Sequence, residues 1–303
     1  MEEEVIIMID IVNISKSFDG YKALQDVSFQ LTKGEIVGFI GKNGAGKTTC
    51  INIIMGLLHP DSGYVELNHS QSNHPLRIGY LPENPSFYPW MTPVEFLNYH
   101  LGHHNFQYIE QLLDFVGLKE HQHRRIKGFS RGMRQRLGIA VALIHQPEIL
   151  ILDEPASALD PQGRNDILNI IIDLKKKGLT ILFSSHILSD VEKVCDRVIM
   201  IHKGKIIKTI SMHQLSKQYM TDVLEITFQK EPMYEHIINL TEISGIKSYD
   251  HQERTLKLTL INNDAYFKIM DYLSYHKFIC EKLAFSLPEL DDLFLKEVMS
   301  YEK

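Results

Sequence analysis

Residues 41–48 combine glycines, a lysine and a threonine at a spacing that suits phosphate chemistry. Gly41, Gly44, Gly46, Lys47 and Thr48 match the GxxxxGK[ST] pattern without a mismatch. Glycines let the backbone curl so that its N–H groups point at phosphate oxygens, and a helix beginning near Lys47 would add its positive end. The lysine can then neutralise the β- and γ-phosphates, and the threonine hydroxyl can ligate Mg²⁺. The loop therefore predicts binding of a nucleoside triphosphate with Mg²⁺.

Two adjacent carboxylates, Asp153 and Glu154, follow the apolar run 149–152. A buried strand would deliver Asp153 beside the phosphate loop, where it can hold Mg²⁺ directly or through water. Glu154 would then be placed to orient and deprotonate an attacking water. This pair predicts hydrolysis of the triphosphate, with Glu154 as base and Lys47 as a catalytic cation.

Four further segments narrow the class of enzyme. One segment, 129–136, precedes the carboxylate pair and includes Ser130, Arg131, Gly132 and Met133. A second segment follows the pair and consists of Ser157, Ala158, Leu159 and Asp160. The other two are single residues: His186, which comes after the next apolar run, and Phe18, which precedes the phosphate loop. Together with that loop, they resemble the motifs of the ABC (ATP-binding cassette) ATPase family: its signature, its D-loop, its switch histidine and its adenine-stacking aromatic. The resemblance covers roughly residues 5–215.

The resemblance implies a role for each segment. Phe18 would stack on the adenine of ATP, and His186 would contact the γ-phosphate and help to fix Glu154. Ser130 and Gly132 would reach the γ-phosphate of an ATP held by a second subunit, which is either a second copy or a paralogue. The remaining ATP contacts would come from the phosphate loop, including Asn43, Ala45, Lys47, Thr48 and Thr49.

The sequence also departs from the family pattern. Phe129, Arg131 and Met133 replace the usual Leu, Gly and Gln of the signature. Glu83 stands where the family has a glutamine, and its carboxylate would join Thr48 and Asp153 as a Mg²⁺ ligand. With these changes the sequence resembles the bacterial exporter ATPases of the bacitracin- and daunorubicin-resistance type, which pair with a separate membrane permease.

Composition is consistent with that partnership. The chain has 303 residues, 44% of them hydrophobic and 23% charged, with a net charge of −6 that favours neither nucleic acid nor anionic lipid. No stretch approaches the about 18 apolar residues of a membrane-spanning helix, so another chain would supply the transport pathway. We expect a peripheral protein at the cytoplasmic face of the membrane. Cys50, Cys195 and Cys280 show no metal-type spacing.

The elements expected around these residues follow an α/β pattern. Residues 1–215 alternate strands and helices, as in a P-loop cassette, with a helical insertion at about 84–140. The first helix is expected at 47–58, and Asp160 and Pro161 suit the N-cap and the first turn of a later helix. The polar segment 211–222 is typical of a linker. Residues 216–303 are predicted to be a small α+β accessory domain, whose strand-helix-strand-strand-helix-strand order is that of ferredoxin-like folds. A last helix is expected at 287–299.

Some alternatives stay open at this level. A non-transport ABC ATPase acting on ribosomes or nucleic acid is one, although the usual second cassette, coiled coil or zinc insertion is not seen. A nucleotide-sensing regulatory module is the other, although Lys47, Asp153, Glu154 and His186 argue against it. Phe87, Tyr88 and Trp90 can either receive a permease helix or pack within the insertion.

Overall fold

The structure is a computed structural model that describes residues 6–68, 75–218, 222–285 and 290–301. By its internal contacts the chain divides into two compact units. The first comprises Met1–Met212 together with Leu293–Lys303, and the second comprises His213–Asp292. Across the described ranges, each helix is too short or too polar to cross a lipid bilayer.

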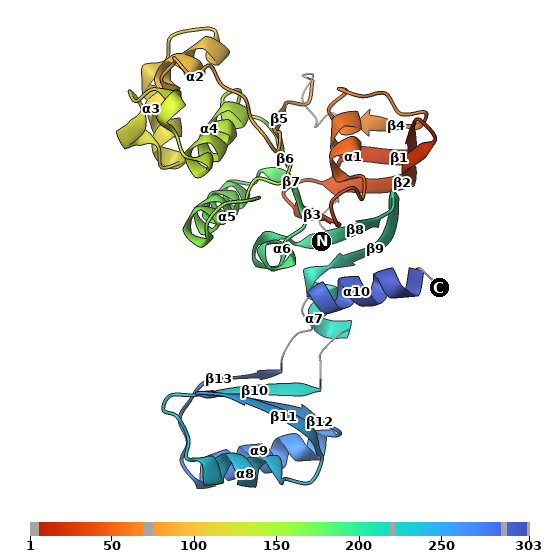
Figure 1. Ribbon diagram of the computed structural model, residues 1–303, viewed down its shortest axis with the longest axis vertical. Helices are drawn as coiled ribbons and strands as arrows, with labels where there is room; N and C mark the ends of the chain where they lie inside the picture. The colour runs from red at the N-terminus through yellow and green to blue at the C-terminus, as the bar shows by residue number, and fades with distance from the viewer. Residues whose placement is uncertain (1–5, 69–74, 219–221, 286–289, 302–303) are drawn as a thin grey trace. The chain divides into compact units, whose positions relative to one another are not determined.

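The first unit is built on a mostly parallel sheet (Figure 1). Its strand order is β5-β6-β7-β3-β8-β9, and only β9, which pairs with β8, runs antiparallel to its neighbour. The strands are β3 (Ile36–Ile40), β5 (Ile78–Leu81), β6 (Ile149–Leu152), β7 (Thr180–Ser185), β8 (Arg197–His202) and β9 (Lys205–Ser211). Strands β3, β6 and β7 are buried along their whole length, as expected for parallel strands covered on both faces.

A second, antiparallel sheet in the order β2-β1-β4 packs against this framework. It contains β1 (Ile7–Phe18), β2 (Tyr21–Thr32) and β4 (Ser62–Leu67). Phe29 of this sheet and Phe39 of β3 pack with ring centroids 5.4 Å apart. Helix α1 (Lys47–Ile54) contributes Ile51 to the same core. The core therefore fixes where α1 begins, and with it the phosphate loop.

The region predicted as a helical insertion contains α2 (Pro93–Leu101), α3 (Phe106–Phe115) and α4 (Arg131–Leu143), with short 3₁₀ turns η1 (Lys119–His121) and η2 (Ile126–Gly128). Thr92 and Glu95 form a capping box that begins α2. Two more helices, α5 (Pro161–Lys176) and α6 (Leu188–Val194), follow β6 and β7. Asp160 caps α5 and Pro161 occupies its first turn, as the sequence predicted.

Two sequence expectations about local structure were wrong. The first helix was expected to reach residue 58, yet α1 ends at Ile54 because Gly56 adopts a positive φ of 68°, which turns the chain out of the helix. The segment 211–222 was expected to be a linker, but it contains α7 (Met212–Gln218). Leu215 of this helix is buried, which explains why its polar composition was misleading.

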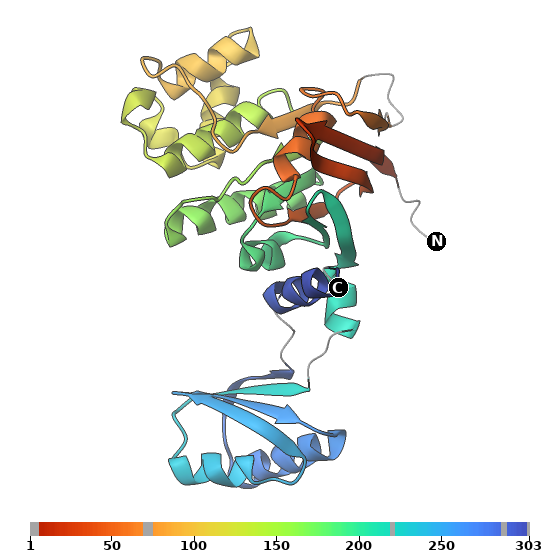
Figure 2. The ribbon, with the colours of Figure 1, turned by 45° about the vertical axis from the view of Figure 1, so that its right-hand side comes forward.

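The second unit folds as one antiparallel sheet with helices on one face (Figure 2). Its elements are β10 (Val223–Phe228), α8 (Tyr234–Thr241), β11 (Ile246–Gln252), β12 (Thr255–Leu260), α9 (Asn263–Tyr275) and β13 (Cys280–Phe285). The sheet order is β11-β12-β10-β13. Leu224, Ile226 and Phe228 alternate toward the buried face, where they pack with Ile237 and Ile269 of the helices.

The last helix, α10 (Leu290–Tyr301), belongs in large part to the first unit. Glu297 forms an ion pair of 3.0 Å with Lys208 of β9, and the ring of Tyr301 lies against His202 of β8. Phe294 and Val298 are buried. The domain boundary near residue 215 stays a prediction.

Candidate functional site

The phosphate loop lies between β3 and α1 and is held open by close backbone contacts. A Cβ at Gly41 would come within 2.5 Å of the Ile201 carbonyl oxygen, and one at Gly46 within 2.7 Å of the Ala23 carbonyl oxygen. Gly46 also has a φ of 112°, which L-residues rarely adopt. These two positions therefore require glycine.

Lys47 is almost fully buried, with its ammonium group at the centre of the loop. Its Nζ donates to the carbonyl oxygens of Gly41 and Lys42, at 2.7 and 3.4 Å. The same Nζ lies 3.1 Å from Oε1 of Glu154, with both side chains less than a tenth exposed. The structure thus brings the predicted cation and the predicted base into direct contact.

Asp153 lies at the end of β6, beside the first turn of α1. Its Oδ1 accepts a hydrogen bond of 2.6 Å from Ser184 Oγ, and Thr48 forms a second hydrogen bond with the carboxylate. Burial raises the pKa of Asp153 above its usual value, while the hydrogen bonds from Ser184 and Thr48 act in the opposite direction. Among the described residues, Asp153 Oδ2 is buried and has no hydrogen-bond partner.

This unpartnered oxygen is what a divalent cation would satisfy. Carboxylate and hydroxyl oxygens are the donors that Mg²⁺ prefers, and Thr48 and Asp153 supply both kinds at one place. No three acidic, histidine or cysteine side chains in the described ranges gather as a self-contained metal cage. The residues present therefore suit a Mg²⁺ ion that is shared with substrate phosphates, as is common for this ion.

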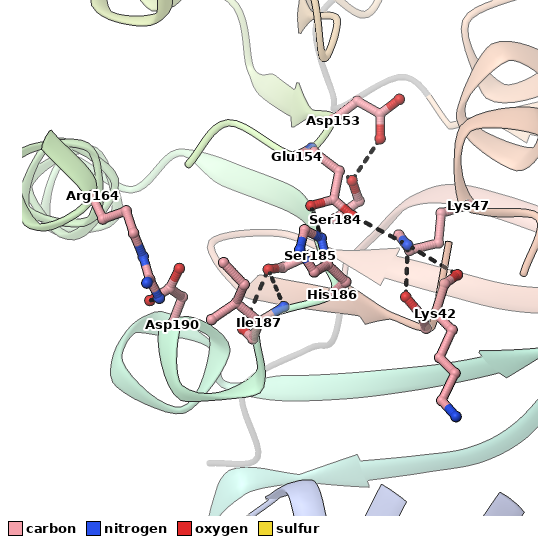
Figure 3. A network of polar contacts seen from close by, with 11 residues as sticks. Lys42, Lys47, Asp153, Glu154, Arg164, Ser184, Ser185, His186, Ile187 and Asp190 are labelled. Carbon is pink, nitrogen blue, oxygen red and sulfur yellow. Dashed lines mark hydrogen bonds and ion pairs between the residues drawn. The ribbon is translucent and has the colours of Figure 1, made fainter. Parts of the chain in front are cut away.

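Glu154 adopts an unusual backbone conformation directly after Asp153. Its φ is 49°, in the left-handed region, and its N–H donates to Ser184 Oγ at 2.9 Å. Its Oε2 lies 2.7 Å from Nδ1 of His186 (Figure 3). Ser184 therefore holds both Asp153 and the Glu154 backbone, a role that the sequence analysis missed because serine in an apolar strand carries no distinctive signal.

A cavity of about 390 Å³ opens in front of these groups. The predicted residues in its wall are Phe18, Asn43, Gly44, Gly46, Lys47, Thr48, Thr49, Glu83, Glu154, Ser157 and His186. Phe18 is 45% exposed, so its ring is accessible from the cavity. Tyr21 and Ala23 also line the cavity and were not predicted; the Tyr21 hydroxyl donates to the Gly44 carbonyl oxygen at 3.2 Å. The sequence signal that could have identified Tyr21 is its aromatic ring, three residues after Phe18.

The signature residues Ser130, Arg131, Gly132 and Met133 do not line this cavity. Ser130 begins α4, where its Oγ accepts a hydrogen bond of 3.2 Å from the Met133 N–H. Met133 is buried, while Arg131 and Gly132 are partly exposed at the N-terminal end of the helix. The chain alone therefore does not bring its signature to its own phosphate loop.

The segment 157–160 runs from the cavity to α5. Ser157 lines the cavity, Ala158 has a φ of 53°, and Asp160 accepts a hydrogen bond of 2.8 Å from the Gly163 N–H. Glu83 also lines the cavity, and its backbone oxygen accepts a hydrogen bond of 2.8 Å from Gln135 Nε2 on α4. Gln135 is 2% exposed and was not predicted.

The chain is similar to known proteins over most of its length. Residues 24–157 match the family described as ABC transporter. The uncharacterised ABC transporter ATP-binding protein YxlF of Bacillus subtilis is 43% identical over 74% of this chain and 78% of its own length. The bacitracin transport ATP-binding protein BcrA of Bacillus licheniformis is 35% identical over 83% and 84% of the two chains.

A solved structure of an ATP-binding subunit of an ABC transporter superposes with a TM-score of 0.61, at 30% identity, over 70% of this chain and 93% of the other. The similarity to ABC transporter ATP-binding proteins thus extends far beyond three motifs, namely the phosphate loop, the carboxylate pair after β6 and the histidine after β7. The protein belongs to the family of ABC transporter ATP-binding proteins, the ATPase subunits of these transporters.

Proposed function

We propose that the protein binds MgATP in the cavity in front of the phosphate loop and hydrolyses it with the residues that line this cavity. The observation that carries this proposal is the position of Glu154, whose carboxylate lies 3.1 Å from Lys47 and 2.7 Å from His186. Lys47 and the loop N–H groups hold the triphosphate, and Phe18 stacks on the adenine. Glu154 takes the proton of the attacking water, while His186 keeps its carboxylate oriented. A bound Mg²⁺, held by Thr48, Asp153 and Glu83, would neutralise charge on the phosphates.

A second subunit completes the site in this proposal. Ser130 and Gly132 lie away from the chain's own cavity, at the exposed start of α4. A helix N-terminus with free N–H groups binds phosphate well. We therefore place the signature of one subunit against the γ-phosphate held by another, in a dimer of identical chains or of paralogues. Loss of the γ-phosphate then loosens the dimer.

The partner in transport is a separate membrane permease. Tyr88, Trp90 and Tyr99 form an exposed aromatic surface, with the rings of Tyr88 and Trp90 stacked at 5.2 Å. Aromatic side chains exposed together are typical of protein interfaces. We propose that this aromatic surface receives the permease, which places the chain peripherally at the cytoplasmic face of the membrane.

We propose export as the direction of transport, because the departures at Arg131, Met133 and Glu83 resemble those of bacterial exporter ATPases. BcrA, which is 35% identical to this chain, is named as a bacitracin transport protein. The net charge of −6 does not favour nucleic acid as a partner. We propose an exporter ATPase with an accessory unit at residues 213–292, whose strand order and helices are those of ferredoxin-like domains.

Steady-state ATPase assays on the purified chain test the catalytic proposal. Turnover that needs Mg²⁺ and that is lost in Glu154→Gln supports it. Purification from the source cell membrane in mild detergent, followed by identification of bound membrane proteins, tests the transport proposal. Turnover without any membrane partner, together with co-purifying ribosomes or nucleic acid, would favour the non-transport alternative instead.

A further inference from the structure

Arg164 and Asp190 form an ion pair that the proposed hydrolysis does not use. Arg164 Nη2 donates to Asp190 Oδ1 at 2.8 Å (Figure 3). The Asp190 side chain is 2% exposed and that of Arg164 is 28% exposed. Within the described structure, the second carboxylate oxygen of Asp190 is also buried and has no hydrogen-bond partner. The arginine is thus the group that compensates a buried charge.

Each of the two residues lies in the first turn of a helix. Arg164 lies in the first turn of α5, four positions after Asp160, and its N–H donates to the Asp160 carbonyl oxygen at 3.0 Å. Asp190 lies in the first turn of α6, four positions after His186. The ion pair therefore joins the start of the helix after segment 157–160 to the start of the helix after the switch histidine.

The backbone next to each helix is itself fixed. Asp160 caps α5 through the Gly163 N–H. Ser185 Oγ accepts a hydrogen bond of 2.9 Å from the Ile187 N–H, which closes a tight turn directly after β7. The contacts thus form a continuous connection from segment 157–160 through α5 and the ion pair to α6, which begins directly after His186 and Ile187.

We propose that Arg164 and Asp190 are positioning residues that couple segment 157–160 to the contact between His186 and Glu154. The proposal rests on the proposed function, since it assumes that Glu154 and His186 act in ATP hydrolysis. Segment 157–160 borders the cavity at Ser157. We therefore expect this segment to shift when the cavity is occupied or closed, and the ion pair would carry that shift to His186 and Glu154.

Kinetics of two conservative variants test the coupling. Asp190→Asn keeps the shape of the side chain and removes its charge, and it should lower kcat about tenfold while the KM for ATP changes little. Arg164→Lys keeps a charge beside Asp190 and should retain more of the activity. Asp173→Asn, which removes an exposed ion pair with Lys176 on the same helix, is the control and should match the wild type.

A double variant separates positioning from simple stability. If Asp190 acts through His186, adding Asp190→Asn to His186→Ala should produce no further loss of kcat. Multiplying losses in the double variant would overturn the proposal. Equal losses in kcat and in ATP affinity for Asp190→Asn alone would also overturn it, because they would indicate general damage to the site.

Hydrogen–deuterium exchange tests the same coupling without ATP turnover. Asp190→Asn should speed amide exchange in both 157–163 and 184–188, whereas Asp173→Asn should leave both segments unchanged. Unchanged exchange in 184–188 would overturn the proposed coupling whatever the ATPase result. If the wild-type chain lacks ATP turnover while Asp190→Asn still speeds exchange in both segments, the proposed function is rejected and the coupling is supported.

Discussion

The carboxylate of Glu154 accepts a hydrogen bond of 2.7 Å from Nδ1 of His186, and this contact joins the ends of two neighbouring strands. Lys47 lies on the other carboxylate oxygen, at 3.1 Å. One side chain is therefore fixed from two sides, by a cation of the phosphate loop and by the switch histidine. This arrangement restricts the direction in which Glu154 can take a proton.

Removal of the base should slow hydrolysis and spare binding. Glu154→Gln keeps the size of the side chain but cannot accept the proton, so kcat should fall by roughly 10²–10⁴. Phosphate release measures the rate, and titration with a fluorescent ATP analogue measures affinity. Glu120→Gln, at an exposed glutamate in η1, is a matched control and should behave as the wild type. Near-normal turnover in Glu154→Gln would reject this residue as the base.

Asp153→Asn should stabilise the nucleotide-free protein at neutral pH. Burial raises the pKa of Asp153 in the folded state, so the folded protein binds this proton more tightly than the unfolded chain does. Asp153 thus destabilises the fold increasingly as pH rises from its unfolded pKa through its higher folded pKa. The asparagine has no such charge, and its advantage should vanish in acid.

Thermal unfolding of both proteins across pH checks this prediction. Each kcal/mol gained should raise Tm by about 2–4 °C in a domain of this size. The same variant should lose its response to Mg²⁺, because an amide is a weaker ligand than a carboxylate. An asparagine variant that is less stable at pH 7 than at low pH, relative to the wild type, would show that the sign is wrong.

Mixing two inactive variants should restore activity if the site is shared between subunits. Lys47→Ala removes the phosphate loop function and Ser130→Ala removes the signature function. In a mixed dimer, the intact loop of the Ser130→Ala subunit faces the intact signature of the Lys47→Ala subunit, so one complete site forms. ATPase assays on co-refolded or co-expressed pairs measure the recovery.

The same mixture distinguishes the role of Ser130 in catalysis from its role in capping α4. Loss of the cap costs about 1 kcal/mol of stability and should leave both variants folded. Ser130→Thr retains a capping hydroxyl and is the control. Activity that does not recover on mixing, although the mixed dimers form, would indicate that the signature acts within its own chain.

Substitution of the aromatic surface should separate hydrolysis from permease binding. Tyr88, Trp90 and Tyr99 do not line the ATP cavity, so changing all three to alanine should leave basal ATPase activity unchanged. Binding to the permease should weaken at least about thirtyfold, since one aromatic anchor at an interface can contribute about 2 kcal/mol or more. Co-purification with the permease and its stimulation of turnover are the measurements. Tyr249→Ala, at an exposed tyrosine of β11, is the control.

Local signals in the sequence were sufficient to predict features that depend on residues close together in the chain. The phosphate loop, the end of β6 at Leu152 and the cap at Asp160 were all predicted, because glycine spacing, apolar runs and capping preferences act within a few positions. Helix lengths were less certain. The end of α1 depends on Gly56, and α7 depends on the burial of Leu215.

Residue types and their spacing along the chain were enough to predict triphosphate binding and to name the side chains available for hydrolysis. How those side chains meet depends on tertiary contacts: Lys47 against Glu154, Ser184 between Asp153 and Glu154, and Tyr21 beside the phosphate loop. Tertiary contacts also place most of α10 with the first unit. The reason is physical, since each of these contacts joins residues that are distant in the chain and come together only when the strands pair and the core closes.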